Sequence, residues 1–215
     1  LKVSMFFAVS GITVSFWLPP LVAFSLSFFT SMLGISGAFL LLPFQMSVLG
    51  YVSPSVSATN LVFNLVAIPG GVWRYIREER MDWRLASTVA VGTLPGLLAG
   101  WWLRIHWLLD PRSFKFFVGL VLLGLAIRLL CAQAGSGISS RAAAGHGERR
   151  QMLILLLALV IGVVGGAYGI GGGSIMAPVL LAFFGMSMHR IAGATLFGTL
   201  LTSVAGVSLY QFIDP

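Results

Sequence analysis

The sequence predicts an all-α, polytopic helical membrane protein with two internal repeats, and three observations carry this prediction. Hydrophobic residues make up 58% of the 215 positions, whereas charged residues make up 9%. A soluble domain usually carries about 25% charged residues to cover its surface, so this chain must hide apolar surface in lipid. Apolar runs of helix length alternate with short charged or glycine-rich stretches. Two of the glycine-rich stretches recur at matching places along the chain.

The first half of the chain contains most of the expected helices. A first helix is expected over residues 18–33, because Pro19 and Pro20 suit the first turn of a helix. Residues 3–16 are also apolar and are a candidate for an extra interfacial segment. The elements expected next are a glycine break at 34–37, a short apolar run over 38–50, a longer run over 55–75, a charged loop over 77–84, and helices over 85–103 and 113–131.

The second half begins after a stretch without apolar periodicity. Residues 132–150 are rich in Gly, Ala, Ser and Arg, which predicts a cytoplasmic linker on the membrane surface. The expected elements after it are a helix over 151–168, a second glycine break at 169–173, a short run over 174–185 and a last helix over 191–212. These elements divide the chain into a first membrane repeat (1–131), the linker, and a second, incomplete membrane repeat (151–215).

The repeat is visible as a single ungapped register. Shifting the chain by 135 residues (34 to 169) aligns Gly34 with Gly169, Ile35 with Ile170, Gly37 with Gly172, Pro43 with Pro178, Gly50 with Gly185, Gly71 with Gly206, Val72 with Val207 and Tyr75 with Tyr210. The counterparts of the helices at 85–103 and 113–131 would fall beyond Pro215. We expect a truncated sequence in preference to a second repeat that has lost two helices.

The charges between the apolar runs predict how the chain is oriented. Loops 76–84 and 132–150 lie on one side and carry, with their flanks, Arg74, Arg77, Arg80, Arg84, Arg128, Arg141, Arg149 and Arg150. The opposite loop, 104–115, carries only Arg104, Arg112 and Lys115. Cytoplasmic loops are enriched in Lys and Arg, so the first side is expected to be cytoplasmic. If residues 34–50 cross the membrane, the repeats are inverted, which we prefer; if this run completes a broken crossing, they are parallel.

The two glycine breaks are the candidate functional sites. Glycine weakens a helix in the membrane and frees backbone groups that lipid cannot bind, so such breaks persist where they face protein or a hydrated cavity. Broken helices at matching positions of two repeats are typical of secondary transporters. Helices that begin near Ala38 and Ser174 would direct N–H groups and positive dipole ends at a shared anion site. The alternative is close helix packing through small residues.

Small polar residues follow the breaks in the same register. Asn60 aligns with Thr195, and Asn64 aligns with Thr199 one helical turn later, so their side chains share a helix face. They could hold an oxyanion, or they could form interhelical hydrogen bonds. Thr59 is a weaker candidate. The expected substrate-binding residues are Gly34, Ser36, Gly37, Asn60, Asn64, Gly169, Gly171, Gly172, Gly173, Ser174, Thr195 and Thr199.

Other ligand classes find no support in the sequence. The net charge of +7 is spread over loops and does not form a basic face, which argues against nucleic-acid binding. The single cysteine, Cys131, and the three scattered histidines give no metal-ligand spacing, and no cofactor is expected. No acidic residue lies in the middle of an apolar run, so the coupling ion is not visible.

At the glycine breaks, the sequence resembles the TauE/SafE sulfite exporter family. The resemblance rests on the run from Gly169 to Ser174 with Pro178, Gly185, Ala194 and Thr195, and on a degenerate first copy from Gly34 to Gly37 with Pro43, Gly50, Ala58 and Thr59. It covers about residues 18–213. The resemblance implies a permease or exporter of small sulfur-containing anions, such as sulfite or an organosulfonate, in the bacterial inner membrane. Ser36 and Ala38 stand where the second copy has Gly171 and Gly173.

Two other functions were weighed. The sequence from Gly34 to Gly37 has the GxSG form found around the nucleophile of rhomboid intramembrane proteases, but no histidine lies in mid-helix to act as its base. We therefore expect no enzyme and no catalytic residues. The stronger alternative is a structural or accessory subunit that keeps its packing surfaces and binds other membrane subunits without transporting.

Overall fold

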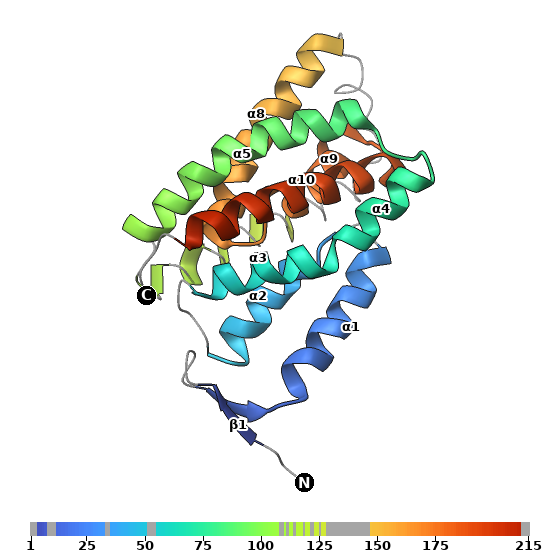
Figure 1. Cartoon of the computed structure of the whole chain (residues 1–215). Helices are drawn as coiled ribbons and strands as arrows, with labels where there is room; N and C mark the ends of the chain where they lie inside the picture. Colours follow the sequence, from blue (N-terminus) through green and yellow to red (C-terminus); the bar gives the residue numbers. More distant parts are fainter. Residues whose placement is uncertain are drawn as a thin grey trace.

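The computed structural model describes residues 4–7, 12–32, 35–50, 55–107 and 147–211, together with 110, 112–113, 115–117, 119–120, 123–124 and 126–127. The first half contains helices α1 (Leu18–Met32), α2 (Ala38–Ser47), α3 (Ser55–Ala67), α4 (Pro69–Arg77) and α5 (Trp83–His106). The second half contains α8 (Gly147–Tyr168), α9 (Gly172–Phe184) and α10 (Met188–Tyr210). The described helices occur in the expected order around the two glycine breaks (Figure 1). The helix expected over 113–131 falls on residues of which only some are described, and Gly34 of the first break lies outside the described residues.

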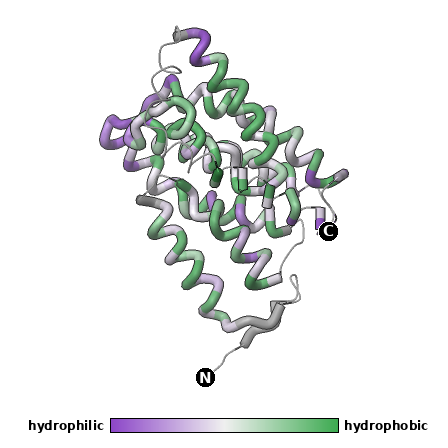
Figure 2. The backbone as a smooth tube through the Cα atoms, turned by 180° about the vertical axis from the view of Figure 1, so that it is seen from behind, coloured by the Kyte–Doolittle hydropathy of each residue, from purple (hydrophilic) through white to green (hydrophobic). Residues whose placement is uncertain are grey.

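Four helical segments in the described part of the chain are long and apolar enough to cross a membrane: Val56–Arg77, Trp83–His106, Glu148–Tyr168 and Met188–Tyr210. Large apolar side chains also face outward: Trp17, just before α1, is 71% exposed, and Phe24 of α1 is 73% exposed. Hydrophilic residues gather at the start of α8 and around the turn between α4 and α5 (Figure 2). An apolar exterior with hydrophilic ends is the distribution that a lipid bilayer requires, so the fold is that of a multi-pass membrane protein.

A short two-stranded hairpin precedes α1 in the otherwise helical described chain. Strands β1 (Ser4–Phe7) and β2 (Ile12–Ser15) pair antiparallel, with Ser4 opposite Ser15 and Phe7 opposite Ile12. β-branched and aromatic residues in these strands favour extended backbone over helix. The hairpin lies within residues 3–16, which the sequence offered as a candidate for an extra interfacial segment.

Two helix boundaries differ from the sequence prediction. The linker expected over 132–150 is wrong at its end, because α8 already begins at Gly147; residues 131–146 lie outside the described residues. Glu148 in the first turn favours the positive end of the α8 dipole, which lets the helix start before the apolar run. The run expected over 55–75 is divided into α3 and α4 at Ile68, because Pro69 has no backbone N–H to continue the helix.

The packing of α5 against α8 depends on small residues spaced four apart. Gly92, Gly96 and Gly100 of α5 face Ala158, Gly162 and Gly166 of α8. A Cβ atom added at Gly96 or Gly100 would lie closer than 3.0 Å to backbone atoms of α8. In lipid no hydrophobic force drives helices together, so close backbone approach through small residues supplies the packing energy. This pair of helices is the rigid centre of the fold.

The corresponding helices of the two halves run in opposite directions. On α10, Gly193 lies against Tyr75 near the end of α4, whereas Gly206 lies against Leu61 near the start of α3. The α3–α4 segment is therefore antiparallel to α10, as the ribbon also shows (Figure 1). α9 runs back along α8, because Gly172 lies beside Gly165 and Arg150 lies over the Phe184 ring. Opposite directions support the inverted arrangement, while the duplication itself stays a prediction.

The inverted arrangement was preferred on the premise that residues 34–50 cross the membrane, and this premise is wrong. Residues 34–50 were expected to form about 17 helical residues and cross the membrane, but α2 has 10 residues. A helix of this length reaches about 15 Å, roughly half of the hydrocarbon core. α2 is therefore a half-crossing that starts at the glycine break and ends before α3.

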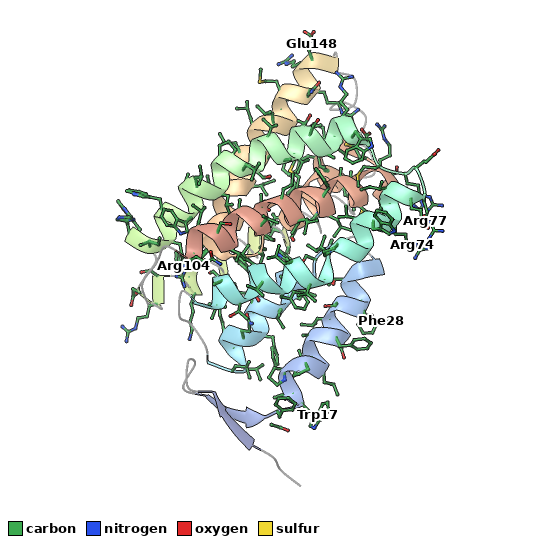
Figure 3. The ribbon with its side chains drawn as sticks, in the orientation of Figure 1. Trp17, Phe28, Arg74, Arg77, Arg104 and Glu148 are labelled. Carbon is green, nitrogen blue, oxygen red and sulfur yellow. The ribbon has the colours of Figure 1, made fainter. Side chains whose placement is uncertain are left out.

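Arg104 is also not the loop residue that the sequence predicted. It lies within α5 and is fully buried, with a relative exposure of 0%. In Figure 3 its side chain lies near the end of α5, beside the end of α10. The apolar run of α5 continues through Trp101 and Leu103, which carries the helix and the arginine inward. Of the three basic residues that were counted for the loop expected over 104–115, Arg104 therefore belongs to a helix instead.

Candidate functional site

Asn64 joins the two glycine breaks at the centre of the molecule. The Ser36 hydroxyl of the first break donates a hydrogen bond to Asn64 Oδ1. Asn64 Nδ2 donates to the backbone carbonyl of Ile170, in the second break, at 2.9 Å and to Ser203 Oγ of α10 at 3.1 Å. Ser36 and Asn64 are buried, with exposures of 4% and 0%. Two chain segments that are far apart in the sequence thus meet at one buried amide.

The second break has a backbone conformation that glycine makes possible. Gly169 and Gly171 both have φ of +78°, a region that residues with a Cβ rarely adopt. A Cβ on Gly171 would also come within 2.9 Å of the Thr199 and Thr202 side chains. The reversal from α8 into α9 therefore requires glycine for two independent reasons, backbone geometry and space.

Hydroxyl groups surround the start of α9. Ser174 Oγ donates to the Ile170 carbonyl at 3.2 Å and lies 3.5 Å from Thr199 Oγ1. Thr199 in turn donates to the Thr195 carbonyl at 2.8 Å. A hydroxyl that donates to its own helix still has lone pairs, and it can rotate to donate to a ligand. These side chains give the second break a polar lining inside an apolar bundle.

Two buried amides near the breaks have unused hydrogen-bonding atoms. Asn60 lies one turn before Asn64 on α3 and is 0% exposed, and neither its Nδ2 nor its Oδ1 has a hydrogen-bond partner among the described residues. The Oε1 atom of Gln45 on α2, 7% exposed, is likewise without a partner in that part of the chain. A buried polar group without a partner costs about 1–3 kcal/mol, so such groups point to a ligand or bound water.

A cavity of about 420 Å³ leads from one end of the molecule to the first break. Its inner end is lined by Ser36 and Gly37, and its mouth by Arg74, Glu78 and Arg80. The walls come from α1, the end of α3, α4 and α10, including Ser27, Ala67, Gly71, His189 and Ala192. A water molecule occupies about 30 Å³ in the liquid, so this cavity has room for a hydrated small anion.

The mouth of the cavity has more positive than negative groups. Glu78 Oε1 pairs with Arg74 Nε at 2.8 Å, and Glu78 Oε2 lies 3.4 Å from Arg80 Nη1. The hydrogen bond from Arg74, with the charges of Arg74 and Arg80, holds the pKa of the Glu78 carboxyl below its usual range. Two guanidinium groups thus face one ionised carboxylate, and the excess positive charge attracts anions to the entrance. Figure 3 shows Arg74 at this end of α4.

The structure brings most of the predicted site residues together. The group at or beside the meeting point of the breaks comprises Ser36, Gly37, Asn64, Gly169, Gly171, Gly172, Gly173, Ser174, Thr195 and Thr199. Asn60 lies one turn away without a hydrogen bond to them, and Gly34 lies outside the described residues. Thr59, the weaker candidate, is exposed next to the buried Asn60 on α3, and its role in the site stays a prediction.

Ser203, Gln45 and the Ile170 carbonyl were missed by sequence reasoning. Ser203 follows Thr199 by four residues, so extending the one-turn spacing of Thr195 and Thr199 would have found it. Gln45 has Leu180 at its repeat-matched position, so the register carried no signal for it. A backbone carbonyl is not visible in side-chain patterns.

The cavity predicts a difference in chemical accessibility between two adjacent residues of α3. In a Cys131→Ser background, Ala67→Cys should react with a charged, membrane-impermeant maleimide, because Ala67 lines the cavity. Val66→Cys should stay unlabelled although Val66 is 81% exposed, because its surface faces lipid. Labelling of intact cells and of inverted vesicles would measure both. Equal labelling at the two positions would contradict a hydrated cavity bounded by lipid-facing helices.

Comparison with known proteins places the chain in a family of membrane transporters. The family described as sulfite exporter TauE/SafE matches residues 20–214. The probable membrane transporter proteins YunE and YjnA of Bacillus subtilis (strain 168) are 23% and 26% identical, covering 82% and 81% of this chain and 71% of each relative. A probable membrane transporter protein of Xylella fastidiosa (strain 9a5c) is 28% identical over 82% of this chain and 65% of its own length. No solved structure matches the chain. This chain belongs to the sulfite exporter TauE/SafE family of membrane transporters.

Proposed function

We propose that this chain is an inner-membrane permease or exporter for small sulfur-containing oxyanions, with its substrate site between the two glycine breaks. The observation that carries the proposal is the convergence at Asn64 of both breaks, beside a cavity whose inner end reaches Ser36. In this proposal the charged end of the cavity, with loops 76–84 and 132–150, faces the bacterial cytoplasm.

The chemistry of the proposed site suits an oxyanion. The Ser36 and Ser174 hydroxyls and the Asn60 amide can each donate to an oxygen atom. Helices α2 and α9 both begin at the breaks, and the Ala38 N–H at the start of α2 donates to Ser36 Oγ at 3.2 Å. The positive ends of two helix dipoles favour an anion without a full positive charge in the site.

A direct test is the flux of radiolabelled sulfite in proteoliposomes. The native chain should carry sulfite, whereas a Gly171→Leu, Gly172→Leu double variant should lose at least about nine-tenths of the flux. Leucine at position 171 is strained at φ of +78° and collides with Thr199 and Thr202, so it closes the space between the breaks. A matched control is Gly70→Ala, because nothing lies within 4 Å of a Cβ at this position.

The outcomes separate the permease from its main alternative. Both variants must insert and elute as single species for the comparison to hold. Flux by the native chain and the Gly70→Ala control, lost in the double variant, would support the proposed site. A well-folded native chain that carries neither sulfite nor an organosulfonate would overturn the proposal and favour an accessory subunit.

A further inference from the structure

A second cluster of basic residues lies apart from the proposed transport site. Arg84 of α5, Arg150 of α8 and Arg190 of α10 line one pocket of about 200 Å³, with Asp82 as the one carboxylate in its lining. Arg84 and Arg150 are 66 positions apart in the chain (84 to 150), and Arg150 and Arg190 are 40 positions apart (150 to 190), so only the fold brings them together. We propose that this pocket binds the phosphate group of an anionic ligand, such as the headgroup of an acidic phospholipid.

The charges in the pocket leave a net positive excess. Arg190 Nη2 pairs with Asp82 Oδ2 at 2.6 Å. Burial raises the pKa of the Asp82 carboxyl, but hydrogen bonds from Arg190 and from the Leu85 N–H outweigh burial and hold the pKa below its usual value. Asp82 is therefore ionised at neutral pH and balances one of the three arginines. The pocket keeps an excess of two positive charges.

The other two arginines are held without carboxylate partners in the described part of the chain. Arg84 donates through Nε and Nη2 to Gln151 Oε1, at 3.3 and 2.8 Å. Arg150 lies over the Phe184 ring, 5.7 Å from its centroid, and its buried Nε has no hydrogen-bond partner among the described residues. A neutral amide and an aromatic face orient these guanidinium groups but leave their charge available to an anion.

The position of the arginines along their helices also favours an anion. Each lies within the first four residues of its helix: Arg84 in α5, Arg150 in α8 and Arg190 in α10. The start of a helix carries partial positive charge, so a cation there is unfavourable by about 0.3–1 kcal/mol. Three such placements around one pocket are stabilised when a negatively charged group binds between them. A general excess of positive charge on this side of the membrane would not require the arginines to converge.

The surroundings of the pocket match a lipid headgroup at the membrane interface. Its inner wall is apolar and includes Leu85, Ile154 and Met186. On the outer face of α8, Met152, Leu153 and Leu156 are 48–59% exposed and continue toward the hydrocarbon core. Trp83, which is 54% exposed, lies next to Arg84, at the depth where tryptophan is enriched in membrane proteins. Basic pockets between transmembrane helices bind anionic headgroups in this setting.

A bound phosphate would connect the two halves of the molecule. Arg84 belongs to the first half, whereas Arg150 and Arg190 belong to the second. The ligand would bridge the starts of α5, α8 and α10 on the same side as the cavity mouth. This inference does not depend on the transported substrate, because the pocket shares no lining residue with the cavity.

The test measures binding of short-chain phospholipids to the purified full chain in neutral detergent by microscale thermophoresis. Phosphatidylglycerol should bind saturably and phosphatidylcholine at least about fivefold more weakly, since each nearby arginine contributes about 1 kcal/mol. Arg150→Gln and Arg84→Gln should each weaken phosphatidylglycerol binding about fivefold. The matched control is Arg149→Gln, which removes the same charge one residue away at an exposed position outside the pocket.

Each outcome bears on the inference. If millimolar inorganic phosphate displaces phosphatidylglycerol completely, the result would support the phosphate site. It would assign a soluble phosphate group as the ligand in place of a lipid. Loss of binding in Arg150→Gln and Arg84→Gln, with Arg149→Gln unchanged and all three eluting as the native chain does, supports the lipid. Equal weakening by all three variants, or no saturable binding of either phosphatidylglycerol or phosphate, would overturn it.

Discussion

Replacing Asn64 with leucine is expected to abolish transport and to destabilise the fold. The Asn64 side chain bonds to the first break through Ser36, to the second break through the Ile170 carbonyl and to α10 through Ser203. Leucine has the same number and branching of side-chain heavy atoms as asparagine, but it leaves two hydroxyls and a carbonyl without their partner in a buried site. Interhelical hydrogen bonds in membranes contribute about 0.6 kcal/mol each and up to about 1.7, so the expected loss is about 2–3 kcal/mol.

Sulfite flux and unfolding in denaturant would be measured on the same preparations of this variant. We expect at least a tenfold loss of flux at temperatures where the variant is still folded, since the geometry between the breaks depends on Asn64. Ser208→Ala is the control, because Ser208 is exposed and bonds only to Val204 of its own helix in the described structure. Native flux in Asn64→Leu would show that this amide is only a packing element.

Enlarging Gly100 is expected to have the largest effect on folding. A Cβ there would collide with the Val163 carbonyl and the Ala167 backbone of α8. Backbone atoms cannot move aside as the end of a flexible side chain can, so Gly100→Leu must separate α5 from α8. Overpacking usually costs about 1–3 kcal/mol, and we expect a cost at or above the upper end of this range. Much less folded protein should be recovered from membranes.

The adjacent residue provides the matched control for this prediction. Ala99 is exposed, so Ala99→Leu places a leucine side chain on the lipid side of α5. Size-exclusion chromatography and thermal unfolding of both variants would compare them. If Gly100→Leu were as stable as Ala99→Leu, the close contact between α5 and α8 would not be what holds the centre together.

The sequence was most informative where local backbone chemistry decides the structure. Glycine runs and apolar lengths predicted the two breaks and the long helices of the described residues. The second break was predictable because φ of +78° at Gly169 and Gly171 is a local requirement for glycine. The aligned positions of Asn64 and Thr199 also predicted that polar side chains follow the breaks. The length of α2 was not predictable from hydropathy, because residues 48–50 remain apolar after the helix has ended at Ser47.

Features that depend on contacts between residues far apart in the sequence could not be predicted from it. Asn64 and Ser203 are 139 positions apart, and the pocket of Arg84, Arg150 and Arg190 joins three helices from both halves. Nothing in the local sequence of Arg104 distinguishes a buried arginine from a loop arginine, because it lies next to an apolar run either way. Helix packing decides these cases. The spacing of Gly92, Gly96 and Gly100 was the one such signal visible in the sequence, as a small residue every fourth position.

The most direct measurement of the central claim is the position of a bound substrate analogue. Selenite resembles sulfite in shape and charge, and selenium can be located by anomalous diffraction from crystals of the protein grown with it. A selenium peak within hydrogen-bonding distance of Ser36 or Ser174, between the two breaks and beside Asn64, is the result that we predict. Anomalous density confined to the pocket of Arg84, Arg150 and Arg190, with none at the breaks under saturating selenite, would contradict the proposed transport site.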